Sequence, residues 1–173
     1  MEYSQAFELM FKQARDDGLL VVVSAGNTNT DIDGTNPVRF PQAFSFNNLV
    51  VVMGIDQTGA KWTSSSYGTT SVDIAAPSVN IRAFDNLRVT PAVPYYAAGT
   101  SFAAPMVAAT CALIWEQHPT WTYLQVINHL YATGKFDSGL TSYCATSKLV
   151  NLAQAVGVSC PNCRPQNCLG ECP

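Results

Sequence analysis

Charged residues are scarce in this chain. Only 12% of the 173 residues are Asp, Glu, Lys or Arg, and the nine basic residues form no cluster. Proteins that bind nucleic acid through its phosphates need a basic patch, so a net charge of −3 argues against that class. No apolar run approaches the roughly 18 residues that span a membrane. Histidine occurs only twice, which leaves few positions for a histidine base.

The first residues also lack the features of a secretory signal peptide. The segment 1–5 has no basic region followed by an apolar one and a small-residue cleavage site. The cysteines point the other way, because four of the six stand beside prolines in the last 14 residues: Cys160, Cys163, Cys168 and Cys172. This pattern is typical of disulfides in an oxidising compartment. Loss of an N-terminal segment would reconcile the two observations.

The composition is that of a globular protein, since 47% of the residues are hydrophobic. We expect one domain over residues 1–158, and a Cys-rich tail or linker stub over 159–173. Helical spacing of apolar residues predicts a helix over 3–17. Val-rich runs predict buried strands over 19–24 and 49–53, the second of them ended by Gly54. The other expected elements are short β segments over 62–76, a loop or short strand over 91–99, and helices over 100–117, 122–131 and 149–156. This alternation indicates an α/β layer architecture.

The segment 99–108, Gly-Thr-Ser-Phe-Ala-Ala-Pro-Met-Val-Ala, reads as a nucleophilic serine at the start of a small-residue helix. A serine there has a backbone N–H that the helix does not use, and the helix dipole favours negative charge beside it. Such an N–H can stabilise the oxyanion that forms when Ser101 attacks a carbonyl. The plainer alternative is that Ser101 only caps a buried helix.

A second candidate donor follows the first Val-rich run. In Val-Val-Val-Ser-Ala-Gly-Asn (21–27), Asn27 comes at the carboxyl end of a buried strand, where open α/β sheets bind ligands. Its side-chain amide can donate to the same oxyanion as the Ser101 N–H. The alternative is a turn asparagine after a strand, which is very common.

Four segments in a fixed order resemble the subtilisin-like serine proteases (subtilases). They are Ser-Ala-Gly-Asn (24–27), Ser-Ser-Tyr-Gly (65–68), Val-Asp-Ile-Ala-Ala-Pro (72–77) and Gly-Thr-Ser-Phe-Ala-Ala-Pro (99–105). The resemblance runs from about residue 3 to 156. It implies a three-layer α/β/α fold with a parallel sheet, a nucleophile at Ser101 and an oxyanion-hole donor at Asn27. It also implies a substrate-binding role for Ser24, Ala25, Gly26, Arg39, Gly99 and Thr100.

Arg39 departs from the small residue common at its position in that family. By the resemblance, Arg39 stands at the base of the pocket for the substrate residue that precedes the scissile bond. A guanidinium at that place favours an acidic substrate side chain. The alternative is that Arg39 turns to solvent.

Two members of the catalytic triad are missing from the pattern. The subtilisin order is Asp, His, Ser, and by the resemblance both earlier members belong before Met1. Neither His118 nor His129 stands in the Gly-Thr-His segment that carries the base in that family. Asp31, Asp33, Asp56 and Asp73 are interpreted as loop or surface residues. We therefore expect the chain to lack the N-terminal half of its domain, to be nearly inactive alone, and to expose an apolar sheet edge that aggregates or finds a partner.

The cysteines leave two interpretations open. Cys160 and Cys163 form a CxxC, yet the second pair follows too soon for a usual zinc loop, so disulfides are favoured over zinc. Their connectivity cannot be deduced. Cys111 is expected to be a buried thiol, and Cys144 lies in a loop where it could pair with a cysteine not present here.

Two functions remain as hypotheses. The first is the C-terminal part of a secreted serine endopeptidase, acting on polypeptides through an acyl-enzyme on Ser101. The second is a non-catalytic relative that serves as a binding module. No cofactor is required, no metal ligands are assigned, and structural calcium is implied by the resemblance alone. The expected partners are a polypeptide substrate and the missing N-terminal half, with neither nucleic acid nor membrane, and the parent protein is expected to be extracellular or in the secretory pathway.

Overall fold

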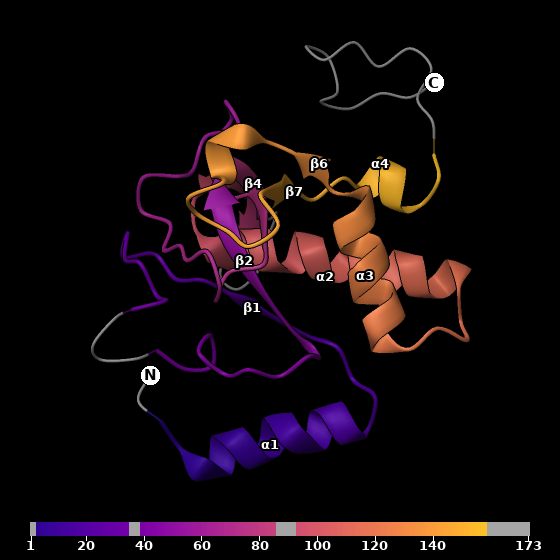
Figure 1. Ribbon diagram of the computed structural model, residues 1–173. Coiled ribbons are helices and arrows are strands. Elements are labelled where there is room, and N and C mark those ends of the chain that lie inside the picture. The colour runs from indigo at the N-terminus through magenta and orange to yellow at the C-terminus, as the bar shows by residue number, and fades with distance from the viewer. Residues whose placement is uncertain (1–2, 35–38, 86–92, 159–173) are drawn as a thin grey trace.

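The computed structural model describes residues 3–34, 39–85 and 93–158 (Figure 1). Its elements are α1 (Gln5–Asp16), β1 (Val21–Ser24), β2 (Leu49–Ile55), β3 (Ile74–Pro77), β4 (Ile81–Asp85), β5 (Val93–Ala97), α2 (Thr100–Gln117), α3 (Tyr123–Thr133), β6 (Lys135–Phe136), the 3₁₀ turn Ser138–Leu140, β7 (Lys148–Leu149) and α4 (Leu152–Ala155). The Cys-rich tail expected over 159–173 lies outside the described residues.

A five-stranded sheet forms the centre, in the order β1-β2-β3-β7-β6. The first four strands pair in parallel, and only β6 runs antiparallel, against β7. Every residue of β2 is buried, as expected for a parallel strand covered on both faces. The expected parallel α/β sheet is thus confirmed. β4 and β5 form a separate antiparallel hairpin.

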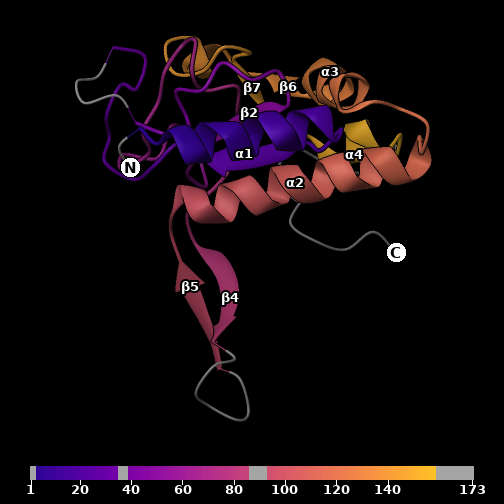
Figure 2. The same cartoon turned by 90° about the horizontal axis from the view of Figure 1, so that it is seen from below.

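Helices cover both faces of the sheet, which confirms the three-layer expectation (Figures 1 and 2). On one face, Val107 and Ile114 of α2 pack with Val50 and Val52 of β2. On the other face, Phe11 of α1 packs with the aromatic side chains of the 44–46 segment and with Val51 and Met53. Alternate β2 residues therefore serve opposite layers, as the period of a strand requires.

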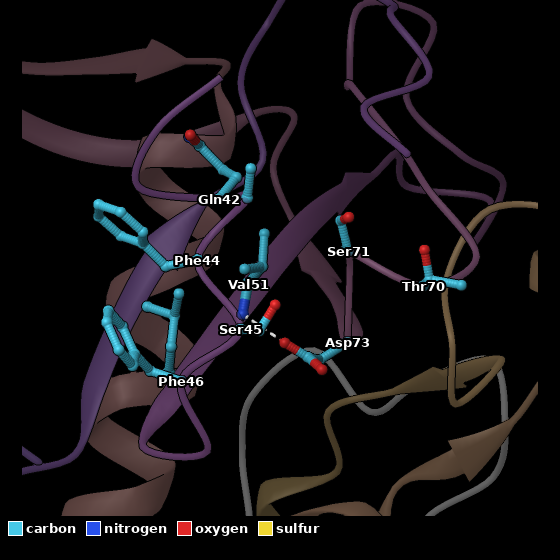
Figure 3. A pocket seen from close by; sticks show the side chains of 10 residues that line it. Gln42, Phe44, Ser45, Phe46, Val51, Thr70, Ser71 and Asp73 are labelled. Carbon is cyan, nitrogen blue, oxygen red and sulfur yellow. Dashed lines mark hydrogen bonds between the residues drawn. The ribbon is translucent and has the colours of Figure 1, made fainter. Parts of the chain in front are cut away.

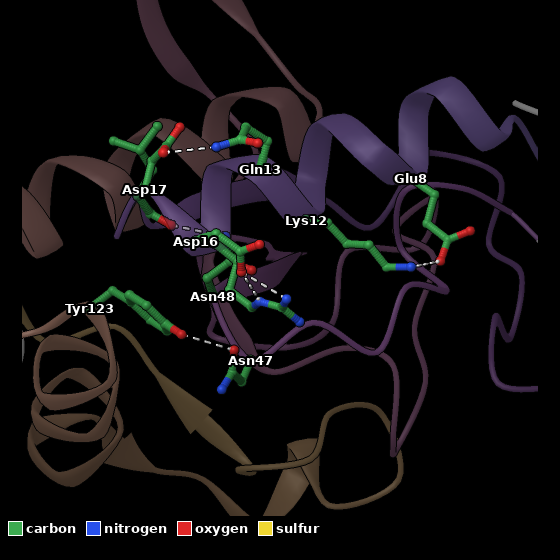
Figure 4. A network of polar contacts seen from close by, with 10 residues as sticks. Glu8, Lys12, Gln13, Asp16, Asp17, Asn47, Asn48 and Tyr123 are labelled. Carbon is green, nitrogen blue, oxygen red and sulfur yellow. Dashed lines mark hydrogen bonds and ion pairs between the residues drawn. The ribbon is translucent and has the colours of Figure 1, made fainter.

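Polar contacts lie along α1 and at its connection to the sheet (Figure 4). Lys12 Nζ lies 3.1 Å from Glu8 Oε1, and Gln13 Nε2 donates to Asp17 Oδ1 at 2.9 Å. These exposed pairs contribute little stability. The buried Asn48 side chain donates to the Leu19 carbonyl at 2.9 Å, which ties the chain entering β1 to the start of β2.

Some expected boundaries were wrong. β2 does not stop at Gly54 but continues through it to Ile55. Of the β segments expected over 62–76, only β3 is a full strand, and residues 62–71 are mostly turns and single bridges. The helix expected over 149–156 is only the short α4, because residues 148–149 pair as β7. The strand β4 was not expected at all.

Gly54 stays in the strand because no side chain fits there. A Cβ on Gly54 would lie 2.2 Å from Ser78 Oγ and 2.6 Å from Ser78 Cβ. Ser78 cannot move away easily, since it is buried and both its N–H and its hydroxyl donate to the Ile55 carbonyl. The glycine is a packing requirement between β2 and the end of β3, not a break in the strand.

The substitution Gly54→Ala is expected to lower the free energy of unfolding by about 2–3 kcal/mol, the usual cost of forcing an extra methyl into a packed core. Gly34→Ala is the matched control, because a Cβ there meets nothing within 4 Å. Its effect is expected to stay within about 1 kcal/mol. Urea unfolding of both variants measures the difference. Equal effects at the two positions would contradict the packing argument.

Candidate active site

Ser101 lies in the first turn of α2, and its side chain is exposed. The helix begins after Gly99, so the Ser101 N–H has no carbonyl one turn earlier to bond with. Nothing else in the described part of the chain accepts a hydrogen bond from it. The structure therefore presents a hydroxyl and a free N–H together at the positive end of a helix.

Asn27 follows β1 and reaches the same helix end. Its Oδ1 accepts from the Thr100 N–H at 2.9 Å and from the Thr100 hydroxyl at 2.7 Å. A backbone N–H can only donate, so the oxygen of the amide must face Thr100. The Nδ2 of Asn27 is consequently turned away from Thr100, with two donor hydrogens free.

The space between the two donors is kept open by Gly99. A Cβ placed on Gly99 would lie 3.5 Å from Asn27 Nδ2 and 3.8 Å from the Ser101 nitrogen. The two donors therefore border one small volume beside the Ser101 side chain. Two N–H donors converging next to a nucleophile are the arrangement that stabilises the oxyanion of acyl transfer.

Hydrogen bonds to residues 24–28 hold the segment that contains Asn27 in place. The Ser66 N–H donates to the Gly26 carbonyl at 2.8 Å, and the Ser66 hydroxyl bonds with the Thr28 hydroxyl at 3.2 Å. Gln42 Nε2 donates to the Ser24 carbonyl at 2.7 Å. Sequence reasoning did not find these supporting roles. Ser66 belongs to one of the segments that carry the resemblance, and Gln42 gives no signal of its own.

The residues expected to bind substrate fall into two groups. Ser24, Gly26 and Arg39 retain some exposure, and Arg39 is on the surface, so its side chain is in contact with solvent. Ala25 and Thr100 are buried. Besides its bonds to Asn27, Thr100 accepts from the Gly26 N–H at 3.2 Å. Because its side chain is fully occupied in this way, we assign Thr100 to positioning Asn27 rather than to touching substrate.

No histidine of the described chain approaches Ser101. The His118 ring stacks on Trp121 with 3.8 Å between ring centres, beyond the far end of α2. His129 lies beside the same tryptophan, with its Nε2 2.9 Å from the Ala155 carbonyl. At about 1.5 Å per residue, α2 alone separates His118 from Ser101 by roughly 25 Å. The described residues thus place the Ser101 hydroxyl beside two N–H donors, with no histidine near them.

Asp73 is a loop residue, as expected, and precedes β3, but it is only partly exposed. It lines a hollow of about 290 Å³ near Phe44 and Ser71, to which neither Ser101 nor Asn27 contributes (Figure 3). Its Oδ2 accepts from the Val51 N–H at 2.7 Å. Burial raises the pKa of Asp73 to about 6, although the bonds from Val51 and from the Tyr131 hydroxyl act to lower it. The carboxyl stays half-buried because the backbone of β2 needs an acceptor there.

The raised pKa gives a pH dependence of stability. A carboxyl whose pKa is higher in the folded than in the unfolded state holds its proton more tightly when folded. Its contribution is therefore greatest below pH 4 and is lost as the pH rises to about 6. In the original chain, the free energy of unfolding is expected to fall by about 1–3 kcal/mol over this interval because of Asp73. We expect this fall to disappear in Asp73→Asn.

Urea unfolding at pH 4 and pH 7 tests this expectation on Asp73→Asn. Asp33→Asn is the control of opposite sign. Burial acts to raise the pKa of Asp33, but bonds from Thr70 and Ser71 outweigh it and lower the pKa. The Asp33 contribution is thus present at neutral pH and lost in acid. If Asp73→Asn leaves the difference in the free energy of unfolding between pH 4 and pH 7 unchanged, Asp73 is not the source of the pH dependence.

The described residues contain no group of three or more His, Cys, Asp or Glu side chains able to hold a metal ion. They do not fit a carboxylate-rich calcium site, and no step below depends on one. Cys111 and Cys144 are buried free thiols, and burial raises the pKa of the Cys111 thiol to about 12. The expected buried thiol at Cys111 is confirmed. Within the same residues, no helix is both long and apolar enough to cross a membrane.

Comparison with known proteins identifies the family to which the chain is similar. The subtilase family profile matches residues 2–152. Alkaline elastase YaB of Bacillus sp. is 33% identical over 147 residues, covering 80% of this chain and 35% of that protein. Subtilisin BL of Lederbergia lenta is 32% identical over 131 residues, covering 75% of this chain and 44% of that protein. The chain thus spans less than half of these two relatives.

Solved structures agree in fold. A protease from Pseudoalteromonas arctica superposes with a TM-score of 0.73 at 27% identity, covering 89% of this chain and 47% of that one. A subtilase cytotoxin superposes with a TM-score of 0.76 at 22% identity, covering 91% of this chain and 55% of that one. The family profile, the related sequences and the shared fold together show that this chain belongs to the subtilase family of serine proteases.

Proposed function

We propose that this chain is the nucleophile-bearing C-terminal part of a serine endopeptidase that cleaves polypeptides. One observation carries the proposal: the Asn27 amide and the Ser101 N–H border the same open volume beside the Ser101 hydroxyl. A binding module has no chemical need for such a pair of donors. Membership of the subtilase family supports the same function.

In the proposed reaction, the Ser101 hydroxyl attacks the carbonyl carbon of the scissile peptide bond. The carbonyl oxygen gains negative charge, and Asn27 Nδ2 and the Ser101 N–H donate to it. The amine then leaves with a proton, an acyl-enzyme remains on Ser101, and water hydrolyses it. A base must take the hydroxyl proton and return it to the amine, and we propose that it lies in the N-terminal half of the domain.

The exposed apolar surface supports the proposal of a missing half. β1 is an edge strand whose three valines are only partly covered. Beside it lies a hollow of about 250 Å³ lined by Leu20, Val22, Ala108, Cys111, Ala112 and Trp115. Ala108, Ala109 and Ala112 of α2 are exposed, and Leu113 is 40% exposed. A helix that is apolar all round is normally buried on every side.

Apolar residues are also exposed on the other layer. Leu9 and Met10 of α1 are each 56% exposed. The uncovered apolar surface therefore includes both helical layers and the open edge of β1. A partner that covers this surface needs a strand with apolar elements on both of its faces. The N-terminal half of the same α/β/α domain has this form. We further propose that the parent protein is extracellular and needs no cofactor for catalysis.

The alternative is a subtilase-like binding module without catalysis, favoured by the lack of a nearby histidine in the described residues. A fluorophosphonate distinguishes the two, because it phosphonylates only an activated serine. We expect rapid labelling of Ser101 when the chain is supplied with an N-terminal subtilase half carrying Asp and His, none in Ser101→Ala, and undiminished labelling in Ser64→Ala. A folded complex that takes no label on Ser101 would favour the binding module.

A further inference from the structure

The ladder between β1 and β2 stops where the segment that carries Asn27 begins. The Ala25 N–H donates to the Val52 carbonyl at 2.9 Å. In this register, the next rung of a parallel ladder would join the Gly54 N–H to the Ala25 carbonyl. The Gly54 N–H instead donates to the Ser65 hydroxyl at 2.9 Å. A segment from further along the chain therefore takes the place beside β2 that β1 leaves.

That segment is the turn 62–66, which we call the wedge. The Trp62 N–H donates to the Gly54 carbonyl at 2.9 Å, and the Ser65 N–H donates to the Trp62 carbonyl at 2.8 Å. Both backbone groups of Gly54 are thus bound by the wedge. Ser65 and Ser66 are fully buried. A buried N–H without an acceptor is costly, and the Ser65 hydroxyl supplies the acceptor that Gly54 needs.

The wedge also holds the peptide group that leads into Asn27. The Ser65 hydroxyl, which accepts from Gly54, donates to the Ser66 carbonyl at 2.9 Å. The Ser66 N–H donates to the Gly26 carbonyl at 2.8 Å. That carbonyl belongs to the peptide bond between Gly26 and Asn27, so its direction determines where the Asn27 side chain starts. A Cβ on Gly26 would lie 3.4 Å from Ser66 Oγ, so the two segments are closely packed.

We propose that Ser65 is a positioning residue for catalysis: its hydroxyl fixes the wedge against β2, and the wedge aims Asn27 at the oxyanion. This inference rests on the proposed function, in which Asn27 Nδ2 donates to that oxyanion. Gly26, the residue before Asn27, is held through its N–H by Thr100 of α2 and through its carbonyl by the wedge. Support from both sides matters because an oxyanion donor is effective only when it is held in place before the reaction.

The first test is peptide hydrolysis by the chain joined to an N-terminal half that supplies Asp and His. Ser65→Ala removes the acceptor for Gly54 and is expected to lower kcat about tenfold with KM unchanged, since the Asn27 donor is displaced rather than removed. Ser65→Cys keeps a weak acceptor and is expected to lie between Ser65→Ala and the original chain. The matched control is Ser78→Ala, because Ser78 is equally buried and its hydroxyl bonds the Ile55 carbonyl of the same strand. It is expected to keep kcat within about twofold.

A double-mutant cycle separates positioning from a general loss of structure. If Ser65 acts through Asn27, adding Ser65→Ala to Asn27→Ala should cost less than about twofold in kcat, because the donor is already gone. The same loss in both backgrounds, or equal losses for Ser65→Ala and Ser78→Ala, would overturn the proposal.

The second test uses this chain alone and needs no peptide cleavage. In proton–nitrogen NMR spectra, Ser65→Ala is expected to move the signals of Asn27 Nδ2 and of the Gly26 N–H, whereas Ser78→Ala leaves them in place. Ser65→Cys provides the same comparison if the alanine variant unfolds. Unchanged signals in a folded Ser65 variant would refute the positioning role. A joined protein that cleaves no peptide would count against the protease function, while the spectra still decide the role of Ser65.

Discussion

Replacing Asn27 by alanine is expected to lower kcat for peptide hydrolysis by about 10²–10³-fold in the completed enzyme, with KM little changed. The figure is the loss found for the corresponding donor of subtilisin, a member of the same family. The physical reason is that Asn27 Nδ2 faces the open volume beside Ser101 and donates to charge that develops only in the transition state. Peptide hydrolysis at saturating substrate measures the loss.

Two further variants make the test specific. Asn29→Ala changes an exposed asparagine in the same loop, whose side chain accepts from Lys61 at 2.8 Å, and it is expected to keep most of the activity. Thr100→Val removes the hydroxyl that bonds Asn27 Oδ1 at 2.7 Å, and it is expected to cost about tenfold in kcat, the value of one hydrogen bond. If Asn27→Ala and Asn29→Ala lose activity equally, Asn27 is not a donor to the reaction.

The second large effect is expected at the uncovered face of α2. Ala112 lines the hollow beside β1 and is exposed in this chain. The substitution Ala112→Glu should leave the chain folded, yet weaken its association with an N-terminal half more than 100-fold. A charge buried without a partner costs several kcal/mol, which accounts for a factor of this size. Titration of the labelled chain with the separate half measures the affinity.

Ala132→Glu is the matched control, because Ala132 is an exposed helix alanine on α3, away from the hollow. It is expected to change the affinity less than threefold. Near-UV circular dichroism of each variant alone reports whether the chain remains folded. Comparable losses for the two variants, or none for either, would show that the α2 face is not where a partner half docks.

Much of the architecture was predictable from the sequence. The Val-rich runs predicted β1 and β2, and the bounds expected for α2 agree with the structure. These elements carry long, continuous apolar patterns, which are the most reliable local signal. The resemblance also named Ser101 and Asn27, because their motifs lie in a characteristic order along the chain.

Other features depend on contacts between distant segments and left no local signal. Gly54 looked like a strand end, but Ser78, 24 residues later, requires the glycine inside the strand. Asp73 is the loop residue that the sequence indicated, but its hydrogen bond from the Val51 N–H of the interior strand β2 left no local signal. The same holds for Thr100, whose role as the holder of Asn27 is visible only once residues 73 positions apart are brought together.

Peptide hydrolysis, compared between the chain alone and the chain joined to an N-terminal half that supplies Asp and His, tests the central claim most directly. The chain alone should reach no more than the roughly 10³–10⁴-fold enhancement over water that an oxyanion hole and binding give. The joined protein should hydrolyse peptides at protease rates, and Ser101→Ala should abolish them. A joined protein that unfolds in one cooperative transition yet cleaves no peptide, or a Ser101→Ala variant that still does, would contradict the assignment of Ser101 as the nucleophile.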